Sequence, residues 1–584
     1  MINRKKIKRE LLTMDMKRIP KKIAVLCGST LGEFIDALEI YLLRQNILPE
    51  FWIGGYNRYF EDAVFNDALA AFKPDVIYIH TTQHNLLNLP EMSDSDDIIN
   101  EKLNKESARW HQIWDVCGER CGCTIIQNNF DLPPERVLGP LDGINFHGKL
   151  RFIRALNEHF ADAALTKSSL YIHDINYLSA AEGLDSWHNA SYMHLYKYAV
   201  SPGGMDVLAK SLSSLLNSLF GGRKKCLVLD LDNTLWGGIV GEAGPEQIEI
   251  GAGSPIGEAF AAFQRYLKQL SESGILLCAA SKNEEEAAKS GFTAPGSVLS
   301  EADFACFYAN WLPKDVNIQN MAKTLNLGLD SFVFIDDNPA ERELIRNRLP
   351  QVAVIEAERP EKFLYELDRS GYFDTLTLSA EDTRRADLYK ENQQRESEKN
   401  NFASYADYLI SLEQTCLFTA ASEKNLERVV QLAGKTNQFN LTTWRITTAE
   451  LIAIASDPAY ITICGSLKDK FGDNGLVTVL IGKIENDTLD ILLWIMSCRV
   501  FSRRLEFAVF DKIISECEKR GIFKIKGVYK PTAKNKPVAG FYAGLNFEKS
   551  GENENGDSFW AYLIQDDYKP MTKEIEIIDQ GVFL

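Results

Sequence analysis

The stretch Val228-Leu229-Asp230-Leu231-Asp232-Asn233-Thr234-Leu235-Trp236 (VLDLDNTLW) runs an apolar strand directly into two carboxylates. Like charges at this spacing repel, and burying them is costly unless a cation or a proton compensates. The pair therefore either caps a solvated strand end or holds a metal ion. In open α/β sheets, ligand sites lie at the carboxyl ends of the strands, where Asp230 and Asp232 are expected. Two anionic oxygens there suit Mg²⁺, a hard cation that prefers oxygen ligands.

A second acidic pair, Asp336-Asp337, ends another apolar run, FVFIDD. If the two strands are neighbours in one sheet, the four carboxylates converge on one cation. Between the pairs, Ser281 ends the apolar run ILLCAAS and Lys314 lies in NWLPKD. A hydroxyl donor and a fixed ammonium group are what a phosphoryl oxyanion requires. The predicted metal ligands are Asp230, Asp232, Asp336 and Asp337.

The order DxDxT, Ser, Lys and DD, over about residues 223–355, resembles the haloacid dehalogenase (HAD) phosphatase superfamily. The resemblance implies that Asp230 is a nucleophile that forms an aspartyl-phosphate. Asp232 would protonate the leaving group and later activate water. Ser281 and Lys314 would hold the phosphoryl group, and Thr234 would orient the loop.

For the metal, the resemblance implies ligation of Mg²⁺ by Asp230, Asp336 and the backbone carbonyl of Asp232, with Asp337 nearby or bound through water. The alternative is that each acidic pair only caps a strand. One DxD motif alone would favour that alternative, but four motifs in this order do not.

The spacing of the motifs predicts a site without a cap domain. About twenty residues separate Trp236 from the next helical run, and Ser281 and Lys314 are 33 positions apart. Neither insert is long enough for a full cap domain, because a βαβ crossover already uses most of the second. We therefore expect an open site that suits a large or protein-borne substrate.

Strand-like and helical runs alternate twice along the chain, which predicts parallel sheets. The first alternation starts at KKIAVLC and the second at KKCLVLDLDNT. The charged stretch SAEDTRRADLYKENQQRESEKNN predicts a helical surface linker. Beyond it, short strands joined by Gly, Asn and Asp turns predict an α+β unit. The predicted parts are a basic lead segment (1–21), a parallel-sheet domain (22–205), a connecting helix (206–222), a phosphatase-like domain (223–375), the charged linker (376–404) and an α+β domain (405–584).

Four longer stretches, LVLDLDNTLWGGIVGEAG, KTNQFNLTTWR, MSCRV and YKPTAKNKPVAGFYAGLNF, together resemble the FkbH-like proteins over almost the whole chain. The resemblance implies an α/β protein of three domains: an SGNH-hydrolase-like domain, a capless HAD-like domain and an acetyltransferase-like (GNAT) domain. It also implies an enzyme that takes a three-carbon unit from 1,3-bisphosphoglycerate and removes its phosphate. That enzyme would load the glyceryl group onto the phosphopantetheine thiol of an acyl carrier protein, as used in polyketide biosynthesis.

Acyl transfer of this kind favours a thiolate, and Cys498, which precedes Arg499, is the candidate. The alternative for Cys498 is a buried structural cysteine at a strand end. Two other functions stay open for the chain. One is a simple phosphatase acting on a small phosphate ester, and the other is a scaffold that docks a carrier protein.

Both flanking domains depart from the patterns of the families they resemble. Ser29 in CGST lacks the aspartate of the SGNH pattern, and Asp174 with Tyr177 stands where Asp-x-x-His is expected, so we predict a non-catalytic domain. The acyl-CoA motif reads RVFSRR, with both small residues replaced, so acetyl-CoA chemistry is not expected. The candidates for docking a carrier protein are Arg499, Arg503 and Arg504.

The bulk composition limits the partners of this 584-residue chain. Its net charge of −17 argues against nucleic-acid binding, because phosphate backbones favour dense Lys/Arg surfaces. Eleven scattered cysteines fit a reducing compartment. The first residues lack the apolar core of a signal peptide, and no uncharged apolar run reaches roughly 18 residues. We therefore expect a cytoplasmic protein without a membrane partner.

Overall fold

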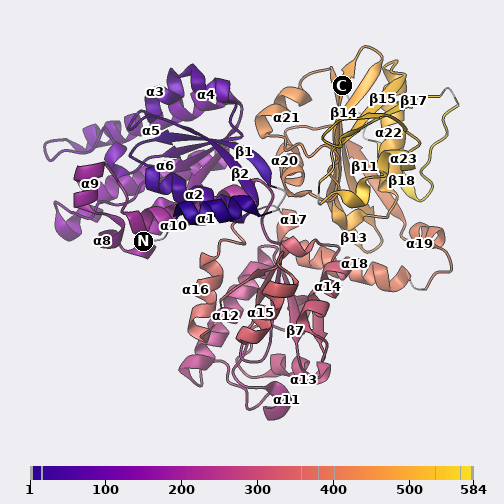
Figure 1. Ribbon diagram of the computed structural model, residues 1–584, viewed down its shortest axis with the longest axis horizontal. Coiled ribbons are helices and arrows are strands. Elements are labelled where there is room, and N and C mark those ends of the chain that lie inside the picture. The colour runs from indigo at the N-terminus through magenta and orange to yellow at the C-terminus, as the bar shows by residue number, and fades with distance from the viewer. Residues whose placement is uncertain are drawn as a thin grey trace. The chain divides into compact units, whose positions relative to one another are not determined.

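The computed structural model describes residues 4–14, 18–356, 358–378, 380–399, 401–532, 534–565 and 567–579. The other residues of the predicted lead segment, linker and C-terminal domain lie outside the described residues. The chain forms two compact units (Figure 1). Unit 1 comprises Met1–Phe220 with Ile446–Ala453, and unit 2 comprises Gly221–Arg445 with Ile454–Leu584.

Unit 1 contains a five-stranded parallel sheet in the order β2-β1-β3-β4-β5. The central strand β3 is buried at every residue, as expected when helices cover both faces of the sheet. The first strand begins at Ile19, three residues before the predicted boundary. The strands are β1 (Ile19–Cys27), β2 (Ile47–Ile53), β3 (Val76–His80), β4 (Thr124–Asn128) and β5 (Leu170–His173).

The predicted connecting helix belongs to the core of unit 1. It is α10 (Pro202–Leu219), which begins four residues before the predicted start, where Ser201 accepts a hydrogen bond from the Gly204 amide. Its apolar face packs against α2 (Gly32–Arg44). The other helices here are α1 (Arg4–Thr13), α3 (Tyr59–Val64), α4 (Asp67–Phe72), α5 (Asp96–Cys121), α6 (Lys149–Thr166), α7 (Ile175–Glu182), α8 (Leu184–Trp187) and α9 (Ala190–Tyr196).

Unit 2 begins with a second parallel sheet, in the order β10-β9-β6-β7-β8. Leu229 pairs with Ile335 on one side and with Ala279 on the other. The residues that follow, Asp230 and Asp336, therefore lie side by side at the carboxyl ends of adjacent strands. The strands are β6 (Cys226–Leu229), β7 (Leu276–Ser281), β8 (Phe304–Ala309), β9 (Phe332–Ile335) and β10 (Ala353–Val354).

The helices of this sheet cover both of its faces, and separate apolar clusters lie on the two sides. Between β6 and β7 the chain forms only α11 (Val240–Ala243) and α12 (Pro255–Glu272), and between β7 and β8 only α13 (Glu285–Ser290) and two short 3-10 turns. All of residues 230–304 are described, so the predicted absence of a cap domain is confirmed there. The remaining helices of this part are α14 (Lys314–Thr324), α15 (Pro339–Arg348) and α16 (Pro360–Arg369).

The charged linker is helical as predicted, and it combines exposed residues with a few buried ones. It forms α17 (Ala380–Thr383) and α18 (Arg385–Lys399). Arg395 is buried, and it makes a two-pronged ion pair with Asp469. Arg503 pairs with the same carboxylate at 2.7 Å. The charges of this stretch therefore hold α18 against the C-terminal sheet, a role that composition alone does not reveal.

The C-terminal part of unit 2 is built on an eight-stranded mixed sheet in the order β16-β17-β15-β14-β13-β12-β11-β18. The predicted α+β pattern with short strands and polar turns is confirmed. The strands are β11 (Gln414–Thr419), β12 (Tyr460–Asp469), β13 (Gly472–Glu485), β14 (Thr488–Met496), β15 (Lys524–Tyr529), β16 (Glu548–Glu552), β17 (Ser558–Leu563) and β18 (Ile575–Asp579). The helices are α19 (Tyr405–Ser411), α20 (Leu426–Lys435), α22 (Leu505–Lys519) and α23 (Phe541–Gly544). Helix α21 (Thr448–Ala455) falls mostly within the segment Ile446–Ala453, which is assigned to unit 1.

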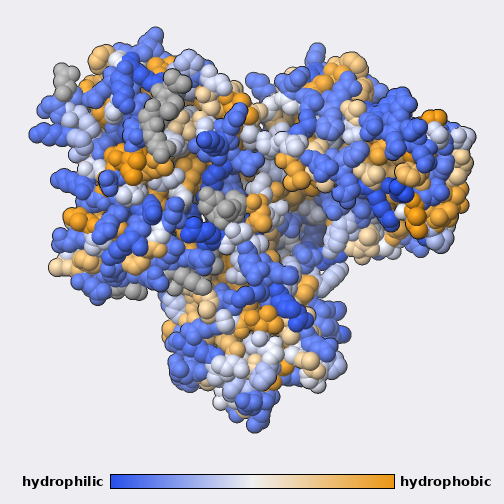
Figure 2. Space-filling view, turned by 180° about the vertical axis from the view of Figure 1, so that it is seen from behind, coloured by the Kyte–Doolittle hydropathy of each residue, from blue (hydrophilic) through white to orange (hydrophobic). Residues whose placement is uncertain are grey.

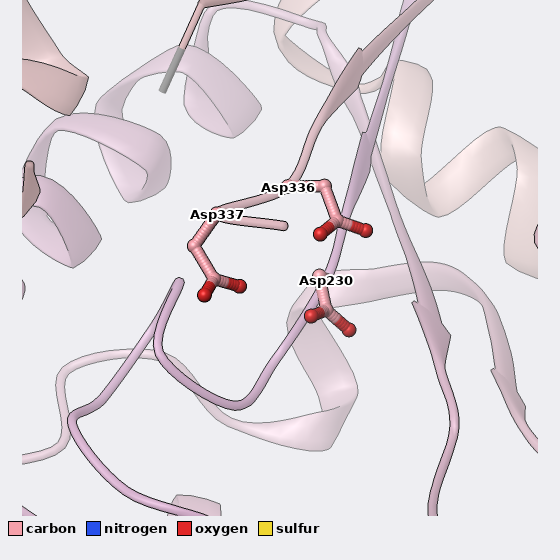
Figure 3. Close-up of side chains that lie close together, drawn as sticks. All are labelled: Asp230, Asp336 and Asp337. Carbon is pink, nitrogen blue, oxygen red and sulfur yellow. The ribbon is translucent and has the colours of Figure 1, made fainter. Parts of the chain in front are cut away.

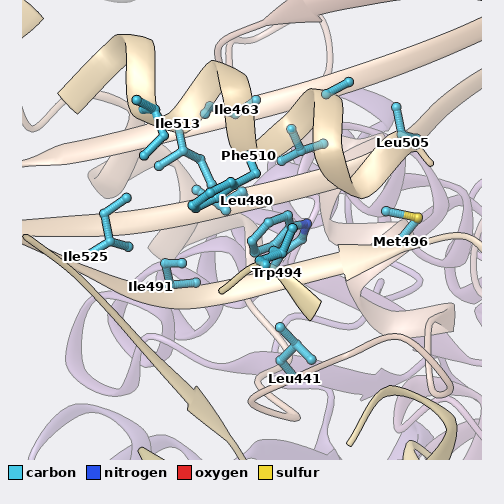
Figure 4. Packing of buried hydrophobic residues seen from close by; sticks show 14 of the residues in the cluster. Leu441, Ile463, Leu480, Ile491, Trp494, Met496, Leu505, Phe510, Ile513 and Ile525 are labelled. Atoms are coloured by element: carbon cyan, nitrogen blue, oxygen red, sulfur yellow. The ribbon is translucent and has the colours of Figure 1, made fainter. Parts of the chain in front are cut away.

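Strands β14 and β15 pair only over residues 488–490 and 524–526 and then separate. The segment 439–442 fills the gap. Leu441 donates its amide proton to Trp494 and accepts one from Lys530, so it bridges the two strands. Figure 4 shows Leu441 beside Trp494 on one side of β14, with Phe510 and Ile513 of α22 on the other. The NQFNLT motif thus forms part of the sheet architecture.

No described helix has the length and apolar character that crossing a lipid bilayer requires. Figure 2 shows a mainly hydrophilic face with hydrophobic residues scattered between the charged ones. The expected cytoplasmic location stays a prediction.

Candidate active site

Three carboxylates converge at the carboxyl end of the second parallel sheet. Oxygens of Asp230, Asp336 and Asp337 lie within 4.8 Å of one another (Figure 3). Asp336 is fully buried and Asp230 is 8% exposed, while Asp337 is half-buried. Among the described residues this is the one group of three or more acidic, His or Cys side chains that could hold a metal ion. Oxygen donors so close together fit a hard divalent cation such as Mg²⁺.

Lys314 lies between two of these carboxylates. Its ammonium group is 2.8 Å from Asp230 Oδ1 and 2.6 Å from Asp336 Oδ2. A lysine at the first residue of a helix opposes the helix dipole, so the carboxylates explain why it is there. Burial alone would lower the pKa of Lys314, but the two carboxylates outweigh it and raise the pKa. Burial raises the pKa of Asp230, and Lys314 opposes that shift.

The side chain of Asp232 is not part of the carboxylate cluster. Its Oδ1 accepts hydrogen bonds from Trp236 Nε1 at 2.9 Å and from the Val240 amide at 3.0 Å. Its Oδ2 accepts one from Asn283 Nδ2 at 3.1 Å. The prediction that all four carboxylates converge is therefore wrong for the Asp232 side chain, whose oxygens are taken by these donors. Ligation through the backbone carbonyl of Asp232, which the family resemblance implies, stays a prediction. The three donors fix the orientation of the Asp232 carboxylate just beyond the carboxyl end of β6. That is the position that a proton-transferring side chain would occupy.

Thr234 connects the two acidic loops. It is fully buried, and its hydroxyl accepts a hydrogen bond from the Asp337 amide at 3.3 Å. Asn233, the residue before it, has a φ of 56°, a left-handed conformation that asparagine tolerates better than most residues. Ser281, the last residue of β7, is buried two strands away from Asp336 in the same sheet.

Sequence reasoning missed three residues of this site. Asn283 and Trp236 hold Asp232 in place. Arg342 is buried and donates hydrogen bonds to the backbone carbonyls of Asp336 at 2.9 Å and Asp337 at 2.7 Å. Asn283 stands two positions after Ser281, a spacing that could have identified it. Nothing in the local sequence identifies Arg342.

Cys498 follows β14 and lies near the amino-terminal ends of β6 and β9, whereas the carboxylates lie at the carboxyl ends of these strands. Cys498 is half-buried, and its backbone carbonyl accepts a hydrogen bond from Asn326 Nδ2 at 3.0 Å. Its thiol lies 4.0 Å from Tyr389 Oη. It lines a cavity with Lys225, which precedes β6, whereas Asp230 follows β6. Lys225 and Asp230, which stand on either side of this strand, are therefore roughly 16 Å apart along it.

Two of the three arginines expected at a docking surface are already paired. Arg503 is buried against Asp469, and Arg504 forms an ion pair with Glu574. The prediction of a solvent-facing patch is therefore wrong for Arg503, because its charge is used inside the protein. In the N-terminal domain, Ser29 is buried and its hydroxyl has no hydrogen-bond partner among the described residues. Asp174 caps α7 by accepting from the Tyr177 amide.

Comparison with known proteins gives one informative structural likeness. The N-terminal part of the protein BF1531 from Bacteroides fragilis, which contains a phosphatase domain and was solved as a complex with Mg, is 29% identical in sequence. The TM-score is 0.59, and the match covers 65% of this chain and all of that one.

Acetyltransferase structures match 26% of this chain. The ribosomal-protein-S18-alanine N-acetyltransferase from Escherichia coli is 12% identical, with 99% of its length covered and a TM-score of 0.21. The PaiA N-acetyltransferase from Thermoplasma acidophilum, solved with coenzyme A, is 12% identical, with 99% covered and a TM-score of 0.22. No protein-family model matches the chain. No curated protein matches it either.

Proposed function

We propose that this protein is a Mg²⁺-dependent phosphatase of the HAD type, acting through the carboxylate cluster of unit 2. The observation that carries the proposal is the convergence of Asp230, Asp336 and Asp337 around one point, with Lys314 beside them. The likeness to a phosphatase-domain protein solved with Mg supports the same reading. A bound Mg²⁺ would be held by these three carboxylates and would neutralise charge on the phosphoryl oxygens.

The reaction begins with attack of an Asp230 carboxylate oxygen on the phosphorus atom. An O–P bond forms, the bond from phosphorus to the leaving oxygen breaks, and that oxygen takes a proton from Asp232. Lys314 and Ser281 donate to the phosphoryl oxygens and stabilise their charge. In the second step Asp232 takes a proton from water, the water oxygen attacks phosphorus, and inorganic phosphate leaves while Asp230 is regenerated.

The finer proposal concerns the substrate. The resemblance to FkbH-like proteins supports a three-carbon unit from 1,3-bisphosphoglycerate and transfer of the glyceryl group to an acyl carrier protein thiol. The absence of a cap domain is compatible with a carrier-borne substrate. If Cys498 accepts the acyl group, acyl transfer takes place near the amino-terminal ends of β6 and β9, and phosphoryl transfer at Asp230 takes place at the carboxyl ends. The two steps are then successive reactions at two separate sites.

The phosphatase proposal is tested with a generic phosphate ester and Mg²⁺. Release of phosphate should stop when EDTA removes the metal and when Asp230 is changed by Asp230→Asn. The matched control is Asp387→Asn, which changes an exposed aspartate of α18 and should leave the rate unchanged. Full activity in Asp230→Asn would overturn the proposed nucleophile.

The substrate proposal is tested by incubating the protein with 1,3-bisphosphoglycerate and a phosphopantetheinylated carrier protein, and then weighing the carrier. A mass increase of one glyceryl group is expected. Ester hydrolysis with no change in the carrier would favour the simple phosphatase. Tight carrier binding with neither reaction would favour the scaffold.

A further inference from the structure

A second cavity in unit 2 differs from the carboxylate site in position and in charge. It has a volume of about 430 Å³, within the usual range of small-ligand sites. None of the residues proposed for the phosphatase reaction lines it, apart from the candidate thiol Cys498. Its walls come from the amino-terminal ends of β6 and β9, from α18 and α20, and from the loop after β14.

The lining is strongly basic in a protein whose net charge is −17. Two carboxylates, Asp330 and Asp382, face seven basic side chains, an excess of five positive charges. Concentrating cations around one cavity costs free energy unless an anion compensates. The seven basic side chains are Lys225, Arg385, Arg428, Lys435, Arg499, Lys534 and Lys536.

The two carboxylates do not compensate all of these charges. Asp382 pairs with Arg385 and Lys435, and Asp330 pairs with Lys534 at 2.5 Å. Lys225 donates only to the backbone carbonyl of Lys435, at 3.3 Å. Arg499 donates to the Ser497 hydroxyl at 3.3 Å. Within the described part of the chain, neither Lys225 nor Arg499 has a carboxylate partner.

Burial raises the free-energy cost of leaving the charges of Lys225 and Arg499 without a counter-charge. Both side chains are half-buried, and burial lowers the pKa of Lys225 and lowers the pKa of Arg499 to about 10. A ligand anion at these two side chains would offset the cost of burying their charges and would be held by charge-assisted hydrogen bonds.

The remaining walls indicate the rest of the ligand. Phe439, Met496 and Leu432 supply apolar surface, which suits a short carbon chain. The side-chain oxygen of Gln438 is buried and has no hydrogen-bond partner among the described residues, so it is ready to accept from a hydroxyl or amide group. The motif KTNQF thus supplies Lys435, the apolar ring of Phe439 and the Gln438 acceptor.

We propose that this cavity is a second ligand site, which binds a small phosphate ester bearing a hydroxyl or amide group, with Lys225 and Arg499 holding the phosphate. The site does not depend on the phosphatase proposal, because it lies at the amino-terminal ends of the parallel strands and the carboxylates lie at their carboxyl ends.

The test uses Cys498 as a reporter on the wall of the cavity. The full chain is treated with iodoacetamide in EDTA, and alkylation of each cysteine is followed by peptide mass spectrometry. Cys121 is the internal control, because it is the other half-buried cysteine and lies in unit 1. Glycerol 3-phosphate should slow alkylation of Cys498 but not of Cys121. Glycerol, which lacks the phosphate, should slow neither.

The variants Arg499→Gln and Lys225→Gln should each need about tenfold more glycerol 3-phosphate for the same protection, as expected when one hydrogen bond to a charged group is lost. The control variant Lys362→Gln, which changes an exposed lysine of α16, should behave like the unchanged protein. The buried cysteines Cys464 and Cys517 of unit 2 should stay unreactive in each variant, which shows that this unit is folded.

Three results would overturn the proposal. The first is no protection of Cys498 at any concentration of glycerol 3-phosphate. The second is protection in the Arg499→Gln and Lys225→Gln variants at the same concentration as in the unchanged protein. The third is loss of protection in Asp230→Asn. The last result would place the bound ester at the carboxylate cluster instead. Inactivity of the phosphatase would leave this experiment unaffected, so the two proposals fail separately.

Discussion

At the residue scale, one ammonium group compensates much of the charge of the candidate active site. Lys314 contacts both Asp230 and Asp336, and all three side chains are largely removed from water. Two carboxylates cannot both stay ionised at this distance unless a cation lies between or beside them. Lys314 and a divalent metal therefore act on the same charges.

We predict that Lys314→Met lowers phosphatase turnover by about 100-fold, the usual effect of removing one donor to a developing anion. The same change should make the protein bind Mg²⁺ more tightly, since the cluster loses the ammonium group that contacts both Asp230 and Asp336. Turnover with a generic ester and titration with Mg²⁺ measure the two effects. Weaker metal binding in this variant would contradict the role assigned to Lys314.

A second residue-scale prediction concerns Asn283, which touches Asp232 and not the carboxylate cluster. Asn283→Ala removes the 3.1 Å hydrogen bond to Asp232 Oδ2. It should lower kcat by about tenfold, the free energy of one hydrogen bond to a charged group, and change KM little. Steady-state kinetics separate the two constants. An equal loss from a higher KM would mean that Asn283 binds substrate instead.

At the element scale, α18 is held to the C-terminal sheet by a buried charge triad. Asp469 accepts from Arg395 on the helix and from Arg503 after β14. We predict that Asp469→Asn destabilises unit 2 by about 3–5 kcal/mol, because two buried guanidinium groups lose their counter-charge. Urea unfolding measures the loss. Lys470→Gln removes an exposed ion pair at the neighbouring position and should cost less than about 1 kcal/mol.

The same triad predicts a pH dependence. Burial alone would raise the pKa of Asp469, but the two arginines outweigh it and hold the pKa below its usual value. A depressed pKa in the folded state gives stability that is present above the unfolded pKa of about 4 and is lost as pH falls through the folded value. Unfolding free energies measured between pH 6 and pH 3 should therefore converge for the unchanged protein and Asp469→Asn. A constant difference down to pH 3 would exclude this origin.

At the scale of the whole molecule, we expect metal binding to change the thermal stability of one unit only. The carboxylate cluster lies entirely in unit 2. A ligand that binds only the folded state stabilises it by about 2.7 kcal/mol at one hundred times its dissociation constant. We predict that Mg²⁺ raises the unfolding temperature of the unit 2 transition and leaves that of unit 1 in place.

Scanning calorimetry with Mg²⁺ and with EDTA tests this expectation. The transition that moves with Mg²⁺ should be the one that Asp469→Asn lowers, since both sites belong to unit 2. Asp336→Asn, which removes a ligand, should abolish the shift. A shift that survives this substitution would place the bound metal elsewhere.

The local sequence determined the strand ends of this protein. Short apolar runs that stop at Asp230, Ser281 and Asp336 can only form buried strands, and parallel strands place their carboxyl ends along one edge. The α/β class and the helical crossovers follow from this periodicity, and the missing cap follows from the spacing of the motifs. The gathering of three of the four predicted acidic residues also requires β6 and β9 to be neighbours, which is a long-range contact. The structure confirms each of them.

Only the tertiary structure determined which charged side chains are buried and which distant segments form the basic cavity. Arg395 of the charged linker is buried against Asp469, a partner more than seventy positions away in the sequence. The basic cavity joins Lys225, Gln438 and Cys498, which stand in three stretches that look unrelated in the sequence. A charge is stable inside a protein only when its counter-charge or ligand arrives from elsewhere in the chain or from solution, and local composition carries no record of that partner.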